Sequence, residues 1–322
     1  MYGDDVATQH AVVTGGAGFL GSHLCDALIA AGHRVTCVDN LSTGSAANLR
    51  QLADEPRFTL VRQDLTEYED ALVGPVDVVY HLAAPAAPSD YLLDPVATMR
   101  IASVGTLNAL DLARDRQAQF VLASTSEVYG PAGDAPSRED QAGSVDPAGG
   151  YGGYYESRMF AEALTTAYRS AYDLRTGIAR IFGTYGPRMR LDDGRVLSRF
   201  IRQVLSGTPL TVPGPGTQTR SLCYVDDAVA GLLAVAGGQY PGPVNIGSPE
   251  AVSVFALARE VAEIAGPDAE IVFVDPPVTD THARRPDVTL AAQLLGWRPR
   301  TGVRDGLAAT LAWFRRARVR HA

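Results

Sequence analysis

The stretch AVVTGGAGFLG, residues Ala11–Gly21, decides the fold. A short apolar run stops at three glycines spaced three apart (Gly15, Gly18, Gly21), and a segment with helical spacing, Ser22–Ala31, follows. Glycines lack a Cβ, so the backbone can turn tightly and approach a pyrophosphate, while a helix N-terminus supplies amides and a positive dipole end. The stretch therefore predicts a strand, a dinucleotide-binding turn and a helix. The alternative is a tight strand–helix turn without a ligand.

A carboxylate at the end of the next apolar run favours the first interpretation. Asp39 closes Arg34–Val38, 18 residues after Gly21. A carboxylate there can accept hydrogen bonds from ribose hydroxyls and would repel a 2′-phosphate, which favours NAD over NADP. The alternative is an ordinary turn aspartate in the pair Asp39-Asn40. Asp64, after the third strand, is expected either to meet the adenine edge or to be a simple loop acid.

Further strand-like runs alternate with helix-like segments through the first half of the chain. These runs are Phe58–Val61, Val76–Tyr80 and Phe120–Ala123. They are short, and polar and apolar residues do not alternate in them, as expected of parallel strands covered on both faces. The pattern predicts the α/β class, a Rossmann-type doubly wound parallel sheet with a smaller C-terminal α/β substrate-binding region. We expect residues 1–182 to bind NAD and residues 183–322 mainly to bind substrate, interleaved in one structural unit.

Several segments after residue 182 are irregular, and long loops in compact domains are often functional. Gly183–Arg195 and Pro276–Pro286 are expected to be loops. Between them, Val196–Leu205 is expected to be a helix, Leu210–Val212 a short strand and Pro213–Gly216 a turn.

Composition excludes several functional classes. The chain has 322 residues, 46% hydrophobic and 20% charged, with 28 basic against 36 acidic side chains and a net charge of −8. This balance argues against nucleic-acid binding, which needs a basic face. The three cysteines are far apart, so no spacing suggests a metal site, and an odd, sparse count fits a reducing cytosol. With no signal-peptide pattern and no apolar stretch of transmembrane length, a cytoplasmic location is expected.

A possible catalytic pair stands in a predicted helix running to about Tyr172. Tyr154 and Arg158 are four residues apart, so they share one helix face. A guanidinium stabilises a phenolate and so lowers the tyrosine pKa, and a tyrosinate can take a hydroxyl proton while hydride leaves the same carbon. Tyr151 and Tyr155 crowd the same segment, so the residues alone leave the choice of tyrosine open.

Several further motifs recur in order along nearly the whole chain. They are GGAGFLGSH, VYHLAAPAAP (Val79–Pro88), STSEVYG (Ser124–Gly130), TYGPRM (Thr184–Met189), DGRV (Asp193–Val196), QTRSLCYVDD (Gln218–Asp227), PVNIG (Pro243–Gly247), RRPD (Arg284–Asp287) and LGW (Leu295–Trp297). Together they resemble the extended short-chain dehydrogenase/reductase superfamily, and most closely the UDP-glucuronic acid decarboxylases, or UDP-xylose synthases. Ser126 before Glu127 resembles a decarboxylase, because the related 4,6-dehydratases usually carry an acid at that position.

The resemblance implies how the reaction proceeds. Tyr154 would be the base, Thr125 would hydrogen-bond the reacting C4 hydroxyl, and Glu127 and Arg284 would manage the sugar carboxylate. Oxidation at C4 turns the C6 acid into a β-keto acid, which can lose CO2 before hydride returns. The product would be UDP-xylose, UDP-4-keto-xylose or both.

The resemblance also implies two sets of binding residues and a homodimer through the helices near Asp94–Arg114 and Tyr154–Tyr172. The cofactor set is Gly15, Gly18, Phe19, Leu20, Asp39, Asn40, Asp64, Leu65, Ala83, Tyr154 and Arg158. The substrate set is Ser126, Arg188, Arg220 and Arg284, with Arg220 on the diphosphate. For Glu127 the alternative is an exposed turn acid, and for Arg284 a surface salt bridge.

Four positions depart from the family pattern. Arg158 replaces the usual lysine, Gly183 and Ala102 replace asparagines, and Pro213 replaces a tyrosine. Two alternatives stay open, and Arg158, Ala102 and Gly183 favour the second of them. One is a nucleotide-sugar 4-epimerase or 4,6-dehydratase of the same superfamily. The other is a noncatalytic NAD-binding sensor.

Overall fold

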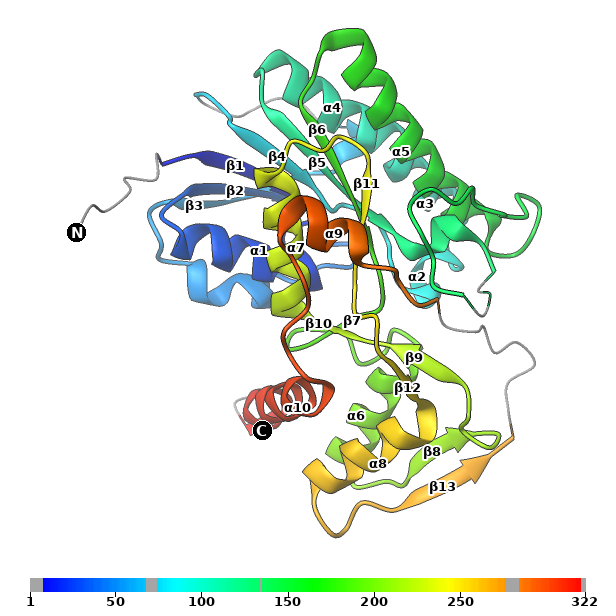
Figure 1. Cartoon of the computed structure of the whole chain (residues 1–322). Helices are drawn as coiled ribbons and strands as arrows, with labels where there is room; N and C mark the ends of the chain where they lie inside the picture. The colour runs from blue at the N-terminus through cyan, green and yellow to red at the C-terminus, as the bar shows by residue number, and fades with distance from the viewer. Residues whose placement is uncertain (1–7, 68–73, 132, 134, 276–283, 320–322) are drawn as a thin grey trace.

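A computed structural model describes residues 8–67, 74–131, 133, 135–275 and 284–319. Its centre is a parallel sheet with the order β11-β6-β5-β4-β1-β2-β3 (Figure 1). The strands are β1 (His10–Thr14), β2 (Arg34–Asp39), β3 (Phe58–Arg62), β4 (Val78–His81), β5 (Gln119–Thr125), β6 (Thr176–Ile181) and β11 (Pro243–Ile246). All seven are parallel to their neighbours, as predicted for a doubly wound sheet.

Helices cover both faces of this sheet. One face carries α1 (Phe19–Ala30), α7 (Val225–Gly237) and α9 (Thr289–Leu295), and the other carries α4 (Thr106–Asp115) and α5 (Gly152–Tyr172). The buried side chains form one hydrophobic cluster on each face, which explains why β1 is apolar at consecutive positions.

Short elements occupy the connections of the large sheet. They are the 3₁₀ turns η1 (Ala46–Leu52), η2 (Leu65–Glu67) and η4 (Ser126–Tyr129), the helices α2 (Pro88–Tyr91) and α3 (Pro95–Arg100), and a π-helical turn η3 (Ile101–Gly105). Strand order reverses between β1 and β4, and ligands of such sheets bind beyond the carboxyl ends of the strands at that reversal.

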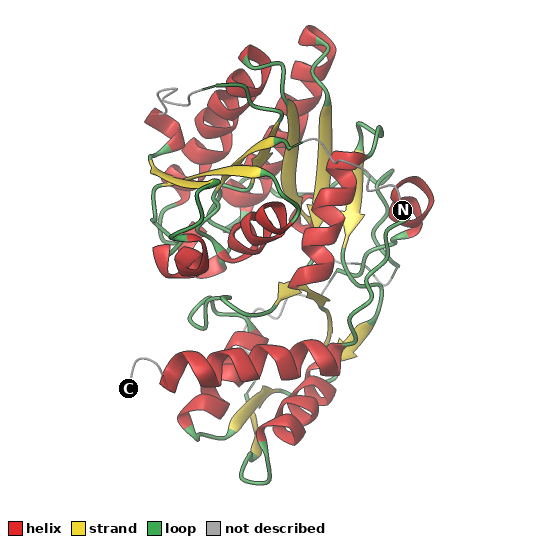
Figure 2. Ribbon diagram, turned by 90° about the vertical axis from the view of Figure 1, so that its left-hand side faces the viewer, coloured by secondary structure: helices red, strands yellow, loops and turns green. Residues whose placement is uncertain are grey.

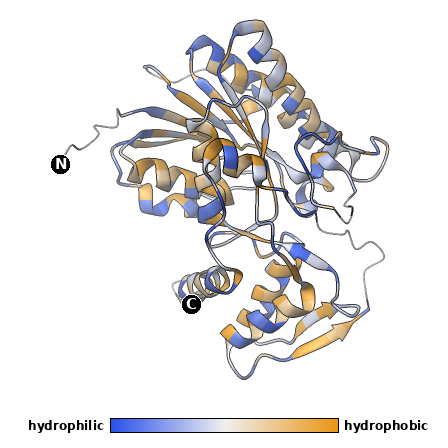
Figure 3. Cartoon of the chain, in the orientation of Figure 1, coloured by the Kyte–Doolittle hydropathy of each residue, from blue (hydrophilic) through white to orange (hydrophobic). Residues whose placement is uncertain are grey.

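A smaller lobe with its own hydrophobic cluster lies below the sheet in the view of Figure 2. It contains α6 (Val196–Ser206), α8 (Val254–Ala265), α10 (Val303–Val319) and the parallel pair β8 (Leu210–Pro213) and β13 (Ile271–Val274). Two further pairs join β7 (Thr184–Tyr185) to β10 (Cys223–Tyr224) and β9 (Thr219–Ser221) to β12 (Ala251–Ser253). Figure 3 shows β13 as a hydrophobic strand at the edge of this lobe, where Phe273 is exposed.

Most predicted elements are present, with shifted ends. Helix α1 begins at Phe19, three residues before the predicted start, because Gly18 already has the extended backbone of an N-cap. Strand β4 begins at Val78, where its pairing with β1 begins, instead of at Val76. The loop Gly183–Arg195 contains the short strand β7, and β8 runs on to Pro213. Within the stretch Pro276–Pro286, residues 276–283 lie outside the described residues.

No helix in the described part of the chain is long and apolar enough to cross a membrane. Cys25, Cys37 and Cys223 are all buried free thiols.

Candidate active site

The glycine turn lies at the carboxyl end of β1 and leaves no room for larger residues. Gly15 has a φ of +70°, and a Cβ there would lie 2.8 Å from the backbone of Ala83. A Cβ on Gly21 would lie 2.2 Å from the carbonyl oxygen of Gly15. The N-cap of α1 is Gly18, which offers no capping side chain to the first turn that Phe19 and Leu20 begin. This helix end therefore has the geometry that suits a pyrophosphate.

Asp39 ties the end of β2 to the glycine turn. Its carboxylate accepts hydrogen bonds from the amides of Ala17 at 2.9 Å and Leu41 at 2.8 Å. Burial raises the pKa of Asp39, and these two hydrogen bonds act against that rise. A carboxylate can accept about four hydrogen bonds, so both oxygens keep acceptor capacity for ribose hydroxyls.

The residues expected near the adenine lie beyond the ends of β2 and β3. The Asn40 side-chain amide donates to Asp64 at 2.7 Å, and Asp64 also accepts from the amide and hydroxyl of Thr66. Leu65, in η2, is buried. The structure thus brings Asn40, Asp64 and Leu65 together beyond the carboxyl ends of β2 and β3, close in the chain to Asp39, the last residue of β2.

Tyr154 is the buried tyrosine of its segment, in the first turn of α5, and only 6% of it is exposed. The side chain of Thr125, the last residue of β5, lies next to its hydroxyl and acts to lower the pKa of Tyr154. Burial raises the pKa of Tyr154, whereas the Arg158 guanidinium lowers it and the Glu127 carboxylate raises it. The structure therefore brings together the phenol, the threonine hydroxyl and the cation that the sequence suggested.

Arg158 is 3% exposed, and the two terminal nitrogens of its guanidinium differ in their surroundings. Its Nη2 donates to the carbonyl oxygen of Ala123, while Nη1 is buried and has no partner among the described residues. Burial lowers the pKa of Arg158. A buried donor without an acceptor is costly, so this atom fits a hydroxyl acceptor such as a nicotinamide ribose. With the open helix end and Asp39, the residues present fit NAD.

Arg284 reaches the same region from the far end of the chain. Its Nη1 donates to Glu127 and its Nε to the carbonyl oxygen of Gly130, both at 2.5 Å, and the guanidinium lies 5.6 Å from the ring centroid of Tyr155. The Arg284 side chain is 9% exposed. Glu127 belongs to η4, which Thr125 caps and which also contains the buried Ser126. A guanidinium, a carboxylate and a phenol thus surround one small region.

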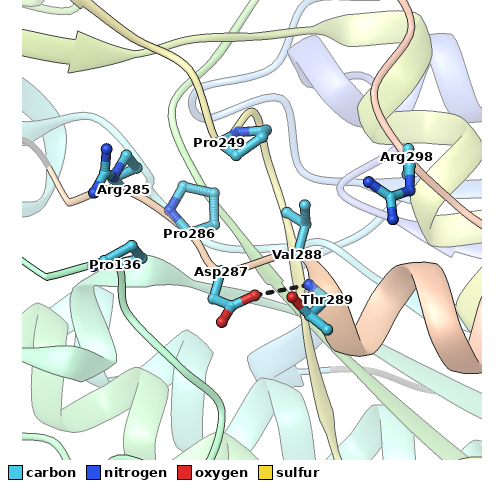
Figure 4. A pocket seen from close by; sticks show the side chains of 8 residues that line it. All are labelled: Pro136, Pro249, Arg285, Pro286, Asp287, Val288, Thr289 and Arg298. Atoms are coloured by element: carbon cyan, nitrogen blue, oxygen red, sulfur yellow. Dashed lines mark hydrogen bonds between the residues drawn. The ribbon is translucent and has the colours of Figure 1, made fainter.

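The neighbouring Arg285 points elsewhere. Figure 4 shows it at a separate surface cavity of about 440 Å³, near Pro286 and Asp287 and with Arg298 across from it. The two consecutive arginines therefore have different surroundings, which makes Arg285 a suitable control for Arg284.

Two expected substrate residues are not brought to this group. Arg188 donates to the Asp26 carboxylate at 2.7 Å and to the carbonyl oxygen of Asn48 at 3.0 Å, so it joins its loop to α1 and η1. Arg220 lies on β9 in the smaller lobe and donates to the carbonyl oxygen of Thr219.

The structure adds residues that the sequence reasoning missed. Glu162 accepts a hydrogen bond from Ser124 at 2.6 Å, pairs with Arg180 at 2.8 Å, and acts electrostatically on Arg158. Its position four residues after Arg158, on the face shared with Tyr154, was a signal that the helix spacing offered. Tyr91, which stacks on Tyr154, had no such signal.

The departures from the family pattern have local explanations in two cases. A Cβ on Gly183 would lie 2.8 Å from the carbonyl oxygen of Ser221, so a larger residue would need a shift of the backbone there. Ala102 is buried in the π-helical turn η3, where a small side chain packs. Nothing in the structure explains Pro213, at the end of β8.

Comparisons with known proteins identify the family of the chain. The NAD dependent epimerase/dehydratase family matches residues 11–247. UDP-glucuronic acid decarboxylase 6 of Arabidopsis thaliana is 46% identical over 92% of this chain and 86% of its own length. UDP-glucuronic acid decarboxylase 1 of Xenopus tropicalis is 42% identical over 95% of this chain and 72% of its own.

A solved structure extends the likeness to three dimensions. The UDP-glucuronic acid 4-epimerase of Bacillus cereus, in complex with UDP-glucuronic acid and NAD, superposes with a TM-score of 0.85 at 29% identity, over 96% of this chain and all of its own. The chain therefore belongs to the NAD dependent epimerase/dehydratase family, an extended short-chain dehydrogenase/reductase family in which the relatives just described at 42–46% identity are UDP-glucuronic acid decarboxylases.

Proposed function

We propose that this chain is an NAD-dependent decarboxylase of UDP-glucuronate, which forms UDP-xylose, UDP-4-keto-xylose or both. The observation that carries the proposal is the Arg284–Glu127 pair beside Tyr154 and Thr125. A planar guanidinium fork matches a carboxylate, and a carboxylate distinguishes glucuronate from glucose. The decarboxylase relatives support the same substrate.

Each residue of this group has a chemical role in the proposal. Tyr154 takes the proton of the C4 hydroxyl, and Thr125 holds that hydroxyl in line by a hydrogen bond. NAD, which the glycine turn, Asp39 and Arg158 would hold, would supply the hydride acceptor for oxidation at C4 and the hydride for the final reduction. Arg284 and Glu127 orient the C6 carboxylate, which leaves once C4 has become a ketone. Ser126 and Arg220 bind other parts of the nucleotide sugar.

Arg158 and Asp39 support the cofactor side of the proposal. The free Nη1 of Arg158 donates to a ribose hydroxyl, and its charge favours the phenolate form of Tyr154. Arginine keeps its proton at all working pH values, so this support is constant. Asp39 accepts from the adenosine ribose, with Asn40 and Asp64 beside it.

A nucleotide-sugar 4-epimerase is the second candidate, because the Bacillus cereus epimerase also binds UDP-glucuronic acid on this fold. An epimerase keeps the carboxylate, whereas a decarboxylase releases it as CO2. A 4,6-dehydratase would act on an uncharged hexose and leave Arg284 without a substrate partner. A noncatalytic NAD-binding sensor would show no reduction of NAD by any sugar.

The deciding experiment is mass spectrometry of the products formed from UDP-glucuronate with added NAD. A product lighter by CO2 supports the decarboxylase, and the mass of the keto or reduced pentose gives the share of each. An isomer of unchanged mass would establish the epimerase instead. The matching dTDP-sugar in a parallel reaction measures the nucleotide preference.

The same proposal includes where the protein works and how it is divided. The part that binds the sugar nucleotide comes mainly from residues 183–322, and the part that binds NAD comes mainly from residues 1–182.

Exposed apolar side chains on α3, η3, α4 and α5 favour a homodimer through this face: Val96, Met99, Val104, Leu107 and Phe160. Three free thiols fit the cytoplasm. Sedimentation measures the dimer.

A further inference from the structure

A second tyrosine covers the ring of Tyr154. Tyr91 ends the short helix α2, and its ring lies parallel to that of Tyr154, with centroids 4.3 Å apart and planes 1° apart. Only 6% of Tyr91 is exposed. Tyr155 packs edge-on against Tyr154, and Tyr151 packs edge-on against Tyr91. The proposed base therefore lies within a group of four aromatic rings.

Helix α2 is held in place by the loop that precedes α6. Four residues cannot form a stable helix in isolation. Arg190 donates from Nη1 to both carboxylate oxygens of Asp90, at 2.8 and 2.7 Å, one residue before Tyr91. Arg195 donates to the carbonyl oxygen of Ala86 at 3.0 Å. The Asp90 side chain is 16% exposed, so the ion pair with Arg190 is partly shielded from solvent and from salt.

We infer that Tyr91 is a positioning residue for Tyr154, and that the Asp90–Arg190 ion pair couples the loop before α6 to the orientation of the base. The inference rests on the proposed function, because it needs Tyr154 to be the base. Tyr91 acts through its ring: it fixes the plane of the Tyr154 phenol and excludes water from one side of it. A small displacement of a reacting group is costly, since about 1 Å can change a rate by roughly a hundredfold.

The charged and titratable groups around Tyr154 determine the sign of the expected pH effect. Arg158 faces it from its own helix, Glu127 from η4 and Arg195 from the loop before α6, and a change at Tyr91 alters none of these three side chains. Tyr91 itself stays neutral, because burial raises its pKa. Removing the Tyr91 ring therefore admits water and leaves the charges unaltered. Water favours the phenolate, so the pKa of Tyr154 should fall.

The test combines a tyrosinate titration with a single-turnover rate. Ultraviolet titration of each protein, minus its Tyr154→Phe counterpart, isolates the ionisation of Tyr154 without any substrate. Stopped-flow absorbance of NADH with UDP-glucuronate gives the rate of C4 oxidation. The variants are Tyr91→Ala, Tyr91→Phe and Arg190→Gln. The control is Arg304→Gln, which removes an arginine paired with Glu260 and Glu263 far from the site.

Tyr91→Ala should slow C4 oxidation roughly ten- to a hundredfold and move the Tyr154 ionisation to lower pH, with NAD affinity unchanged. Tyr91→Phe should restore most of the rate, since it keeps the stack. Arg190→Gln should move both quantities in the same direction by less, and Arg304→Gln should move neither. A merely structural role would reduce the folded fraction, seen by circular dichroism, and leave the ionisation of Tyr154 where it is.

Two results would overturn the inference: an unshifted Tyr154 ionisation in folded Tyr91→Ala, or an unshifted ionisation in Arg190→Gln. The titration needs no sugar, so its outcome is independent of the decarboxylase assignment. A wild-type protein that releases no CO2, together with a shifted ionisation in Tyr91→Ala, would refute the proposed function and support the positioning role.

Discussion

Replacing Arg284 with alanine tests the feature that makes this site suited to a carboxylate. The guanidinium donates to Glu127 and to the carbonyl oxygen of Gly130 in a largely closed position. Arg284→Ala removes the cation that we propose recognises the C6 carboxylate, and it leaves Glu127 without this ion-pair partner. We expect slow CO2 release with NAD affinity intact.

The magnitude follows from the kind of interaction lost. A hydrogen bond to a charged group contributes about 1.5–3 kcal/mol, more than an exposed ion pair at about 0–1 kcal/mol. A loss of about 3 kcal/mol in the transition state corresponds to roughly a hundredfold lower kcat/KM. Arg284→Lys keeps the charge but loses the planar fork, so its rate should lie between those of wild type and Arg284→Ala.

The assay follows carbon dioxide from carboxyl-labelled UDP-glucuronate and NADH absorbance in the same reaction. Arg285→Ala is the matched control, because Arg285 lines the separate cavity of Figure 4. It should behave as wild type. Equal unfolding midpoints of the two variants would show that their folded fractions are the same. Wild-type CO2 release by Arg284→Ala would remove the main reason to propose a decarboxylase, and the epimerase would become the better proposal.

Changes at four further positions have expected outcomes. Tyr154→Phe should bind NAD but almost stop C4 oxidation, measured by NADH absorbance; wild-type turnover in this variant, with loss in Tyr151→Phe, would assign the base to another tyrosine. Arg158→Lys should retain or improve activity, whereas Arg158→Met should move the alkaline rise of the single-turnover rate to higher pH, because the guanidinium opposes the burial that raises the Tyr154 pKa. Asp39→Ala should weaken NAD binding by about 1–3 kcal/mol in a calorimetric titration, and wild-type binding of NADP as tight as NAD would contradict the role of Asp39. Burial lowers the pKa of His23 from 6.5 to about 4, so the protein takes up a proton when it unfolds below pH 6.5. Wild type should therefore lose up to about 3 kcal/mol of unfolding free energy when the pH is lowered to 4. Denaturant titration of His23→Gln should not show this loss.

The fold could be predicted because its signals are local. The glycine turn between an apolar run and a helical segment requires a backbone without side chains, as the close approach of Gly15 to Ala83 shows. Apolar runs without alternation indicated strands buried on both faces. This is right for β1 and β4, which are buried at every position. It is wrong for the run Phe58–Val61, because β3 lies at the edge of the sheet and exposes Thr59 and Leu60. The starts of α1 and β4 were misplaced because an N-cap and a strand pairing determine them, and neither depends on apolar spacing alone.

Part of the candidate site was also encoded locally. Tyr154 and Arg158 share a helix face through their spacing, and Thr125 and Glu127 share one turn. Sequence spacing did not say which tyrosine of the segment is buried. The structure does, because Tyr154 faces β5 and is more deeply buried than Tyr155.

The sequence by itself determined the strand–turn–helix at the start of the chain, the acid at the end of the second strand and the residue types of the candidate catalytic group. Only the tertiary structure decided which distant residues meet. It places Arg284 against Glu127, sends Arg188 to Asp26, and stacks Tyr91 on Tyr154. The physical reason is that these contacts join segments far apart in the chain, whose meeting depends on how the sheet, the smaller lobe and their loops pack, whereas a local motif carries its geometry in consecutive residues.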